Sequence, residues 1–294
     1  MNILVLGSGL LGVSTAYELA KRGFSVSVAD RQEKSGAEGS FSNGAQLSYS
    51  HAEPWGSPYV LPKLPFWILD PNAPLVFSPR ADWQMMKWGL RFLRNCTSSR
   101  ARVNCMNILR LGLYSRQEFE RIRNETGIAY HFSNKGILRI YADEKELEHA
   151  KRQHEFQAKH GCRERLLTRD ECLALEPVLQ HAQRTIVGGI HAFMDEVGDA
   201  YEYCRELSKI AAERHGVKFL YGTDIRGLRV ENGRVAAAET SRGDIATDGF
   251  VMAMGAYSAV HLRTIGLHIP VYPMKGYSVT LKANEFCPES SITD

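Results

Sequence analysis

The sequence contains no long apolar run. No stretch approaches the roughly 20 apolar residues that a membrane-spanning helix needs. A hydrophobic share of 44% with a charged share of 23% is typical of a globular protein. The apolar opening at residues 1–6 has no basic residues before it and leads directly into a glycine-rich turn, which argues against a signal peptide. These absences predict a cytoplasmic protein.

Clustered cysteines and an excess of one charge are also missing. The six cysteines are scattered, with no CxxC pair and no metal-ligand spacing, so we expect neither a disulfide scaffold nor a metal site. The formal net charge is only +3 and no basic tract stands out, so we expect no nucleic-acid partner. What remains is a soluble or peripheral globular protein.

The start of the chain has the pattern of a β-α-β unit. Residues 2–6 form a short apolar run, typical of a strand buried in a parallel sheet. Residues 10–21 have helical periodicity and are followed by Gly23, which can cap the helix. Residues 24–30 then predict a second strand. A chain of 294 residues has room for two packed domains.

The rest of the chain mixes helices and strands. Seven prolines between residues 54 and 79 predict an irregular excursion. Helices are predicted over 82–93, 104–126, 144–160, 168–175 and 199–214, and strands over 136–141, 186–193, 217–221, 225–231, 234–240 and 250–254. This order predicts a second, α+β domain inserted into the first.

Three glycines between the first strand and helix form the pattern G-x-G-x-x-G. Gly7 permits the tight turn, Gly9 lets a phosphate approach the main chain, and Gly12 allows the helix to pack closely on the strand. Backbone N–H groups and the helix dipole can hold a pyrophosphate there. Asp30 ends the second strand, where its carboxylate can accept hydrogen bonds from both hydroxyls of an adenosine ribose. The pattern predicts a dinucleotide site, and FAD and NAD share it.

Eight segments, in order along the chain, resemble those of one flavoenzyme family. They include its FAD fingerprint, a second flavin-contact segment and a late strand with a glycine turn. The segments are 3–31, 39–47, 52–55, 83–96, 188–190, 217–225, 250–258 and 270–278. Across its whole length the sequence resembles the D-amino-acid dehydrogenase family, within the D-amino-acid oxidase and glycine oxidase group of FAD enzymes.

The resemblance implies an α/β fold with a Rossmann-like FAD-binding domain and an inserted α+β substrate domain, of the glutathione-reductase and D-amino-acid-oxidase type. The implied boundaries are 1–80 and 196–268 for the FAD-binding domain, and 81–195 and 269–294 for the substrate domain. The residues implied to contact FAD are Gly7, Gly9, Leu10, Leu11, Gly12, Asp30, Arg31, Ser40, Asn43, Gly44, Ala45, Gln46, Ile225, Ala253, Gly255, Tyr257 and Lys275. No catalytic residue is assigned.

One position departs from the family pattern. The family usually has Asn-Ala-Gly-Gln in the second flavin-contact segment, whereas residues 43–46 here are Asn-Gly-Ala-Gln. Ala45 therefore replaces a glycine, and alanine tolerates a positive φ poorly.

The resemblance also implies a reaction. A hydride would pass from the α-carbon of a D-amino acid such as D-alanine to the flavin, the imino acid would hydrolyse, and the electrons would go to a quinone or another carrier. The flavin performs the difficult chemistry, so no catalytic base is needed if the amine arrives neutral. His51 and Glu53, just past the flavin segment, are candidate polar groups near the substrate.

The family continues well past residue 294, so we expect its C-terminal part, with the carboxylate-binding residues and a last glycine-rich FAD strand, to be absent from this chain. Three alternatives stay open on the sequence. They are a non-catalytic flavin- or nucleotide-binding remnant, an oxygen-using oxidase of the glycine or sarcosine type, and an NAD-linked dehydrogenase.

An aromatic stretch within the proline-rich excursion bears on membrane association. Tyr59, Phe66, Trp67, Ile68, Leu69 and Phe77 can lie at a bilayer interface, and they can equally line the flavin pocket. No clean amphipathic helix with a basic face supports the first reading. Delivery of electrons to a membrane chain, which the family resemblance implies, favours peripheral association with the inner face of the membrane.

Overall fold

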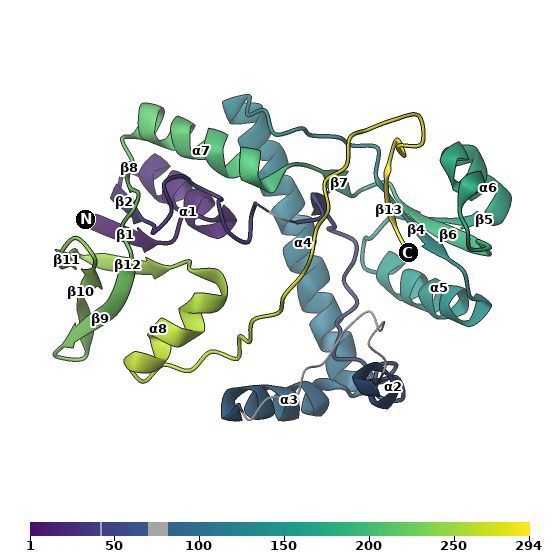
Figure 1. Cartoon of the computed structure of the whole chain (residues 1–294), viewed down its shortest axis with the longest axis horizontal. Coiled ribbons are helices and arrows are strands. Elements are labelled where there is room, and N and C mark those ends of the chain that lie inside the picture. Colours follow the sequence, from purple (N-terminus) through teal and green to yellow (C-terminus); the bar gives the residue numbers. More distant parts are fainter. Residues whose placement is uncertain (42, 70–81) are drawn as a thin grey trace. The chain divides into compact units, whose positions relative to one another are not determined.

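A computed structural model of the chain describes residues 1–41, 43–69 and 82–294. The chain forms two compact units, drawn in Figure 1. Unit 1 comprises residues 1–45, 122–132 and 198–280, and unit 2 comprises residues 46–121, 133–197 and 281–294. Residues 46–69, assigned above to the FAD-binding domain, group with unit 2, whereas residues 122–132 and 269–280, assigned to the substrate domain, group with unit 1. Ser42 and residues 70–81, including Phe77, lie outside the described residues.

Unit 1 is built on a parallel sheet with the strand order β12-β1-β2-β8. Its strands are β1 (Asn2–Leu6), β2 (Ser25–Ala29), β8 (Lys218–Leu220) and β12 (Gly249–Met252). The central strand β1 is buried from Ile3 to Leu6, as a strand covered on both faces must be. The β-α-β unit predicted from the sequence is therefore present, and it brings the carboxyl ends of β1, β2 and β12 to one edge.

Two helices of unit 1 pack together beside this sheet (Figure 1). They are α1 (Leu10–Lys21) and α7 (Ala200–His215), and the rings of Tyr17 and His215 meet edge to face with centroids 5.3 Å apart. The Asp199 side chain caps α7 by accepting from the backbone of Tyr201 and Glu202, and Gly216 ends it with a φ of 69°. Asp199 thus starts this helix as predicted.

The remainder of unit 1 is a small antiparallel sheet and a short helix. The sheet contains β9 (Ile225–Glu231), β10 (Arg234–Thr240) and β11 (Ile245–Ala246). The β9–β10 hairpin turns at Asn232 and Gly233, both with positive φ, as a two-residue hairpin turn requires. After β12 come a 3-10 turn, η2 (Gly255–Tyr257), and α8 (Ser258–Thr264), which the sequence patterns do not predict.

Unit 2 contains a mixed four-stranded sheet with the order β13-β4-β6-β5. The strands are β4 (Ile137–Tyr141), β5 (Arg165–Thr168), β6 (Gly188–Ala192) and β13 (Ser291–Thr293), and only the β13–β4 pair is parallel. A further pair, β3 (Gln46–Leu47) and β7 (Glu196–Val197), is antiparallel. The strands β5 and β13 are not predicted from the sequence, because each is short and lacks clear alternation.

The helices of unit 2 are α2 (Leu64–Leu69), α3 (Trp83–Asn95), most of α4 (Ser98–Thr126), α5 (Glu144–Ala158), α6 (Arg169–Leu175) and the 3-10 helix η1 (Pro177–His181). Thr168 and Glu171 form the predicted capping box of α6. The helix α4 begins six residues before its predicted start at 104, and α2 interrupts the predicted irregular excursion.

The parallel sheet of unit 1 and the α+β second unit confirm the predicted fold class.

Crossing a bilayer demands a long, strongly apolar helix. Within residues 1–41, 43–69 and 82–294, no helix is both long enough and apolar enough to do so. 

Candidate cofactor site

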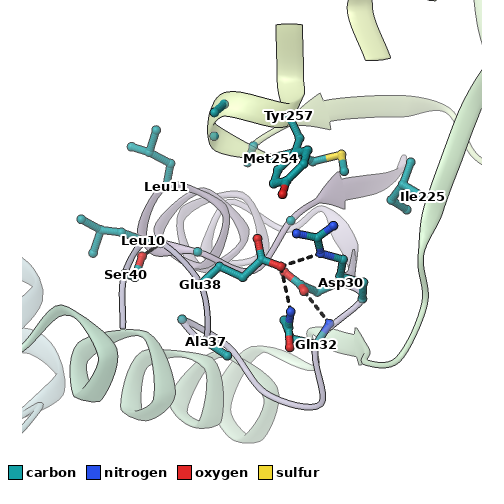
Figure 2. Close-up of a pocket in the computed structure, with 18 of the residues that line it drawn as sticks. Leu10, Leu11, Asp30, Gln32, Ala37, Glu38, Ser40, Ile225, Met254 and Tyr257 are labelled. Carbon is teal, nitrogen blue, oxygen red and sulfur yellow. Dashed lines mark hydrogen bonds and ion pairs between the residues drawn. The ribbon is translucent and has the colours of Figure 1, made fainter. Parts of the chain in front are cut away.

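A cavity of about 370 Å³ opens in unit 1 where the carboxyl ends of β1, β2 and β12 meet the start of α1. Its position is the one at which open α/β sheets bind ligands. Figure 2 shows Tyr257 and Met254 on one side of this pocket, Leu10 and Leu11 at the helix start, and Asp30 near its centre. The lining residues are Gly7, Gly9, Leu10, Leu11, Ala29, Asp30, Arg31, Gln32, Gly36, Ala37, Glu38, Gly39, Ser40, Asp224, Ile225, Ala253, Met254, Gly255, Ala256 and Tyr257.

The three fingerprint glycines are required for different reasons. Gly7 has a φ of 101°, and a Cβ there would lie 2.6 Å from the backbone oxygen of Ala253. A Cβ on Gly12 would lie 1.9 Å from the backbone oxygen of Gly7. Gly9 differs, because its φ is −71° and its nearest neighbour would be the Ser40 hydroxyl at 3.5 Å. Packing within the protein therefore demands glycine at 7 and 12, whereas the surface at Gly9 is left open toward the pocket.

The first turn of α1 presents backbone donors to this open surface. Gly9 is the N-cap and supplies no side-chain cap. The Leu10 N–H donates to the Ser40 hydroxyl at 3.1 Å. The N–H groups of Leu11 and Gly12 have no carbonyl partner within the helix, and no acidic residue occupies the first turn. The helix dipole adds a partial positive charge, so this end of the pocket favours a diphosphate.

Asp30 is held mainly by the glycine turn. One carboxylate oxygen accepts from the Ser8 N–H at 2.6 Å and from the Ser8 hydroxyl at 2.8 Å. The other oxygen accepts from the Gln32 N–H at 2.8 Å. A carboxylate offers about four lone-pair sites. At least one therefore remains for a ribose hydroxyl.

An ion pair and a tyrosine flank Asp30. The Arg31 Nε donates to Glu38 at 2.5 Å, and its guanidinium carbon lies 4.5 Å from the centre of the Tyr257 ring. The hydrogen bond from Arg31 lowers the pKa of Glu38. On the apolar side, Ile225 is buried against the ends of β1 and β2. The pocket thus combines a polar end with an apolar wall.

Eleven of the seventeen predicted FAD residues line this pocket, and Gly12 packs directly behind it. The other five lie elsewhere. Asn43 organises a turn by donating to the Ser40 carbonyl and accepting from the Ala45 N–H, with Gly44 exposed between. Gln46 lies in unit 2, where it donates to Ser291 and Thr293 of β13. Lys275 lies on an exposed irregular segment, with its ammonium over the Tyr277 ring.

Other lining residues are absent from the sequence prediction. They are Ala29, Gln32, Gly36, Ala37, Glu38, Gly39, Asp224, Met254 and Ala256. The glycine at position 36 is the one sequence signal among them. In the structure its φ of 74° and its close approach to Cys204 both require glycine. The small polar stretch that begins at Gly36 indicates a loop, but nothing in it shows which face it presents.

These residues fit FAD. Gly9 leaves room for a phosphate where packing makes no demand, the amides of Leu11 and Gly12 can donate to it, and Asp30 retains one acceptor site for a sugar hydroxyl. The apolar wall at Ile225 can receive an adenine ring. In the described ranges, no group of three or more His, Cys, Asp or Glu side chains is arranged to hold a metal ion.

Unit 2 contains a second set of polar residues, which we call the buried charge cluster: Ser50, Arg139, His154, Glu164 and Asp195. The Glu164 side chain has 0% exposure, and it pairs with Arg139 and, at 3.2 Å, with His154. Asp195, 2% exposed, accepts from the backbone N–H and the hydroxyl of Ser50 at 2.9 and 2.7 Å. Burial raises the pKa of Asp195 to about 6, against the effect of these hydrogen bonds.

The two polar candidates of segment 50–54 are placed near this cluster. Glu53 pairs with His149 at 2.9 Å, and the His149 ring stacks on Tyr59 with centroids 4.0 Å apart. The His51 side chain is exposed. Both residues belong to unit 2, and neither lines the pocket of unit 1.

Known proteins resemble this chain at two levels. A D-amino acid dehydrogenase of Paramagnetospirillum magneticum is 44% identical over 297 residues, which cover 100% of this chain and 70% of that protein. One from Granulibacter bethesdensis is 39% identical over 296 residues, covering 100% of this chain and 71% of that protein. The glycine oxidase structure from Geobacillus kaustophilus has a TM-score of 0.64 and 22% identity, covering 90% of this chain and 58% of that one. This structural likeness shows the fold alone.

The family model described as FAD dependent oxidoreductase matches residues 2–293, nearly the whole chain. This match confirms the predicted flavoenzyme family, and with it FAD as the family's cofactor. The chain spans about 70% of the length of the dehydrogenases and less than two thirds of the glycine oxidase. By this match and by the dehydrogenase relatives, the chain belongs to the FAD-dependent oxidoreductase family.

Proposed function

We propose that this chain takes part in the oxidative deamination of D-amino acids to 2-oxo acids and ammonia, with FAD bound in the pocket of unit 1. One observation carries the proposal: a protein named D-amino acid dehydrogenase is 44% identical along the whole chain. The pocket supports it, because the glycine turn and Asp30 suit the diphosphate and sugar of FAD.

In this proposal the residues of the chain position the cofactor. The amides of Leu11 and Gly12 would hold the diphosphate, Asp30 would accept from a ribose hydroxyl, and Ile225 would contact the adenine. Bound FAD supplies the acceptor for the two electrons and the hydrogen that leave the α-carbon. The substrate loses two hydrogens in all, and water then converts the imino acid to a 2-oxo acid and ammonia.

The electrons then pass to a quinone or another carrier, and the protein works at the cytoplasmic face of a membrane. The name of the relatives supports the first part, since they are dehydrogenases and not oxidases. An acceptor other than oxygen follows from that name if the function is shared.

Flavin binding and D-alanine oxidation test the proposal together. The purified chain is titrated with FAD, and flavin fluorescence is followed. The FAD-loaded protein is then mixed without oxygen with D-alanine or L-alanine. We expect D-alanine to bleach the visible flavin absorbance and L-alanine to leave it unchanged. A protein that binds NAD but not FAD would contradict the proposal, and hydrogen peroxide formed in air would indicate an oxidase.

A glycine substitution separates binding from folding. In Gly9→Ala the new methyl group meets no protein atom closer than 3.5 Å, so the stability of the FAD-free protein should change little. It occupies the surface that a phosphate must approach, so FAD affinity should fall roughly tenfold or more, which corresponds to about 1.4 kcal/mol. Gly89→Ala, an equal change in α3 with nothing within 4 Å, is the control and should leave FAD affinity unaltered.

A further inference from the structure

Helix α3 exposes an apolar stripe to solvent. None of its residues is buried, and Trp83, Met86, Leu90 and Leu93 are 61%, 53%, 60% and 47% exposed. Spaced at i, i+3, i+7 and i+10, these four side chains share one side of the helix. The opposite side faces the protein, where Phe92 and Asn95 lie against Gly56 and the rings of Trp88 and Phe92 stack. The stripe is therefore additional to the side by which α3 packs.

Basic residues border this stripe. Lys87, Arg91 and Arg94 follow one another at i, i+4 and i+7 along the adjoining arc, and all three are exposed. The Lys87 ammonium lies 5.3 Å from the centre of the Trp83 ring, so charge and aromatic surface are in contact. A helix with an aromatic and aliphatic stripe beside a basic border has the composition of helices that lie in the plane of a membrane surface.

The charge extends beyond α3 into the first half of α4. From residue 83 to residue 117 the sequence has no Asp or Glu, and its basic residues are Lys87, Arg91, Arg94, Arg100, Arg102, Arg110 and Arg116. This segment alone carries +7, whereas the whole chain carries +3. The basic residues are spread out and form no tract, so they do not stand out in the sequence. α3 ends at Asn95 and α4 begins at Ser98, so the basic segment runs from one helix directly into the next (Figure 1).

Helix α2 adds apolar side chains in the same unit. Phe66 and Ile68 are 73% and 51% exposed, and Lys63, just before the helix, lies over the Tyr59 ring. No amphipathic helix with a basic face is expected from the sequence pattern. The structure corrects this, because α3 is such a helix.

We propose that the outward face of α3 binds the surface of an anionic lipid bilayer. Charge complementarity selects this occupant: the face is strongly positive, and each basic residue near an anionic membrane strengthens binding by about a factor of five. A second copy of the chain is disfavoured, because pairing two such faces would bring like charges together. This inference deepens the membrane association proposed above by naming the surface responsible.

Vesicle binding by the full chain, without FAD or substrate, tests the inference. Co-sedimentation with vesicles of phosphatidylcholine and phosphatidylglycerol should exceed that with phosphatidylcholine alone at least tenfold. Reversing three charges in Lys87→Glu, Arg91→Glu and Arg94→Glu together should weaken binding to the anionic vesicles at least tenfold. The control reverses three exposed charges of unit 1 in Lys209→Glu, Lys218→Glu and Arg226→Glu together. It should change vesicle binding less than about twofold, because these residues lie outside the basic face of α3.

Insertion of the stripe is tested by tryptophan quenching with brominated lipids. Trp83→Phe should lose most of the quenching, whereas Trp88→Phe, altered on the inward side of α3, should retain it. Equal binding by both charge-reversed proteins, or full quenching in Trp83→Phe, would overturn the inference. A third outcome would also overturn it: the protein does not bind vesicles but forms an oligomer, and the double variant Trp83→Ser with Leu90→Ser is monomeric. Absence of D-alanine oxidation would leave these results intact and refute only the proposed activity.

Discussion

The pocket of unit 1 and the buried charge cluster of unit 2 are both polar, but they are assembled in different ways. The donors around Asp30 are main-chain N–H groups and a hydroxyl from the adjoining turn, at Ser8 and Gln32. In unit 2, Arg139 comes from β4, His154 from α5, and Glu164 and Asp195 from separate loops. The first arrangement follows from two nearby strand ends, whereas the second exists only after distant segments have packed.

The two regions also differ in what holds their charges. Asp30 is half-buried and has backbone donors in place, so it needs no cation. Glu164 is fully enclosed, and removing an ion from water costs several kcal/mol unless a partner offsets it. Arg139 is that partner, although its own Nε has no hydrogen-bond partner among the described residues. Unit 2 therefore depends on long-range ion pairing in a way that the pocket does not.

Removing the Arg139 charge should have the largest effect. Arg139→Met leaves Glu164 buried with only His154 beside it, so the free energy of unfolding should fall by about 3–5 kcal/mol. The measurement is urea unfolding at neutral pH. The control is Arg165→Met, which breaks the exposed Arg165–Glu171 pair and should cost less than about 1 kcal/mol. If both changes cost the same, the contrast between enclosed and exposed pairs is wrong for this protein.

The pH dependence of unit 2 should follow from Asp195. Its pKa rises from the ordinary 3.8 to about 6 in the folded state, because burial disfavours the charged form. A raised carboxyl pKa means that the folded state binds the proton more tightly. Stability is then highest below pH 3.8 and is lost as pH rises toward 6. Two pKa units correspond to about 3 kcal/mol.

Asp195→Asn isolates this contribution, since it keeps the side-chain shape without the titration. The difference in unfolding free energy, wild type minus variant, should fall by about 2–3 kcal/mol between pH 4 and pH 7. Above the folded pKa the difference should be constant. A difference that rises with pH in this window would mean that the hydrogen bonds from Ser50 outweigh burial.

The same contrast explains what the sequence could predict. Gly7, Gly9, Gly12 and Asp30 lie within 30 residues in a β-α-β unit, so their spacing alone predicts one dinucleotide site. The family resemblance, and not spacing, adds the distant lining residues Ser40, Ile225, Ala253, Gly255 and Tyr257. Gln46 and Lys275 were inferred from family segments, and spacing says nothing about which unit a loop residue joins. The outward stripe of α3 has the same periodicity as a core-facing stripe, so only packing distinguishes them.

A substitution at position 45 should have the smallest effect on stability. This position belongs to a turn that can be recognised from the local sequence. Ala45 has a φ of 55°, fixed from both sides: its N–H donates to the Asn43 side chain, and its carbonyl accepts from the Gly198 N–H, each at 2.8 Å. An L-residue in this region costs roughly 1–2 kcal/mol, and glycine avoids that cost but loses more chain entropy on folding.

Ala45→Gly should therefore raise the free energy of unfolding by about 0.5–1 kcal/mol, measured by urea unfolding of unit 1 signals. Ala212→Gly is the control, an equal change at an exposed position within α7, and it should lower stability by about 1 kcal/mol because its backbone is helical. Opposite signs for one substitution would show that the left-handed backbone at 45 is imposed by its neighbours. A loss of stability in both would mean that Ala45 relaxes to a negative φ, and the turn built by Asn43 would then need a different conformation.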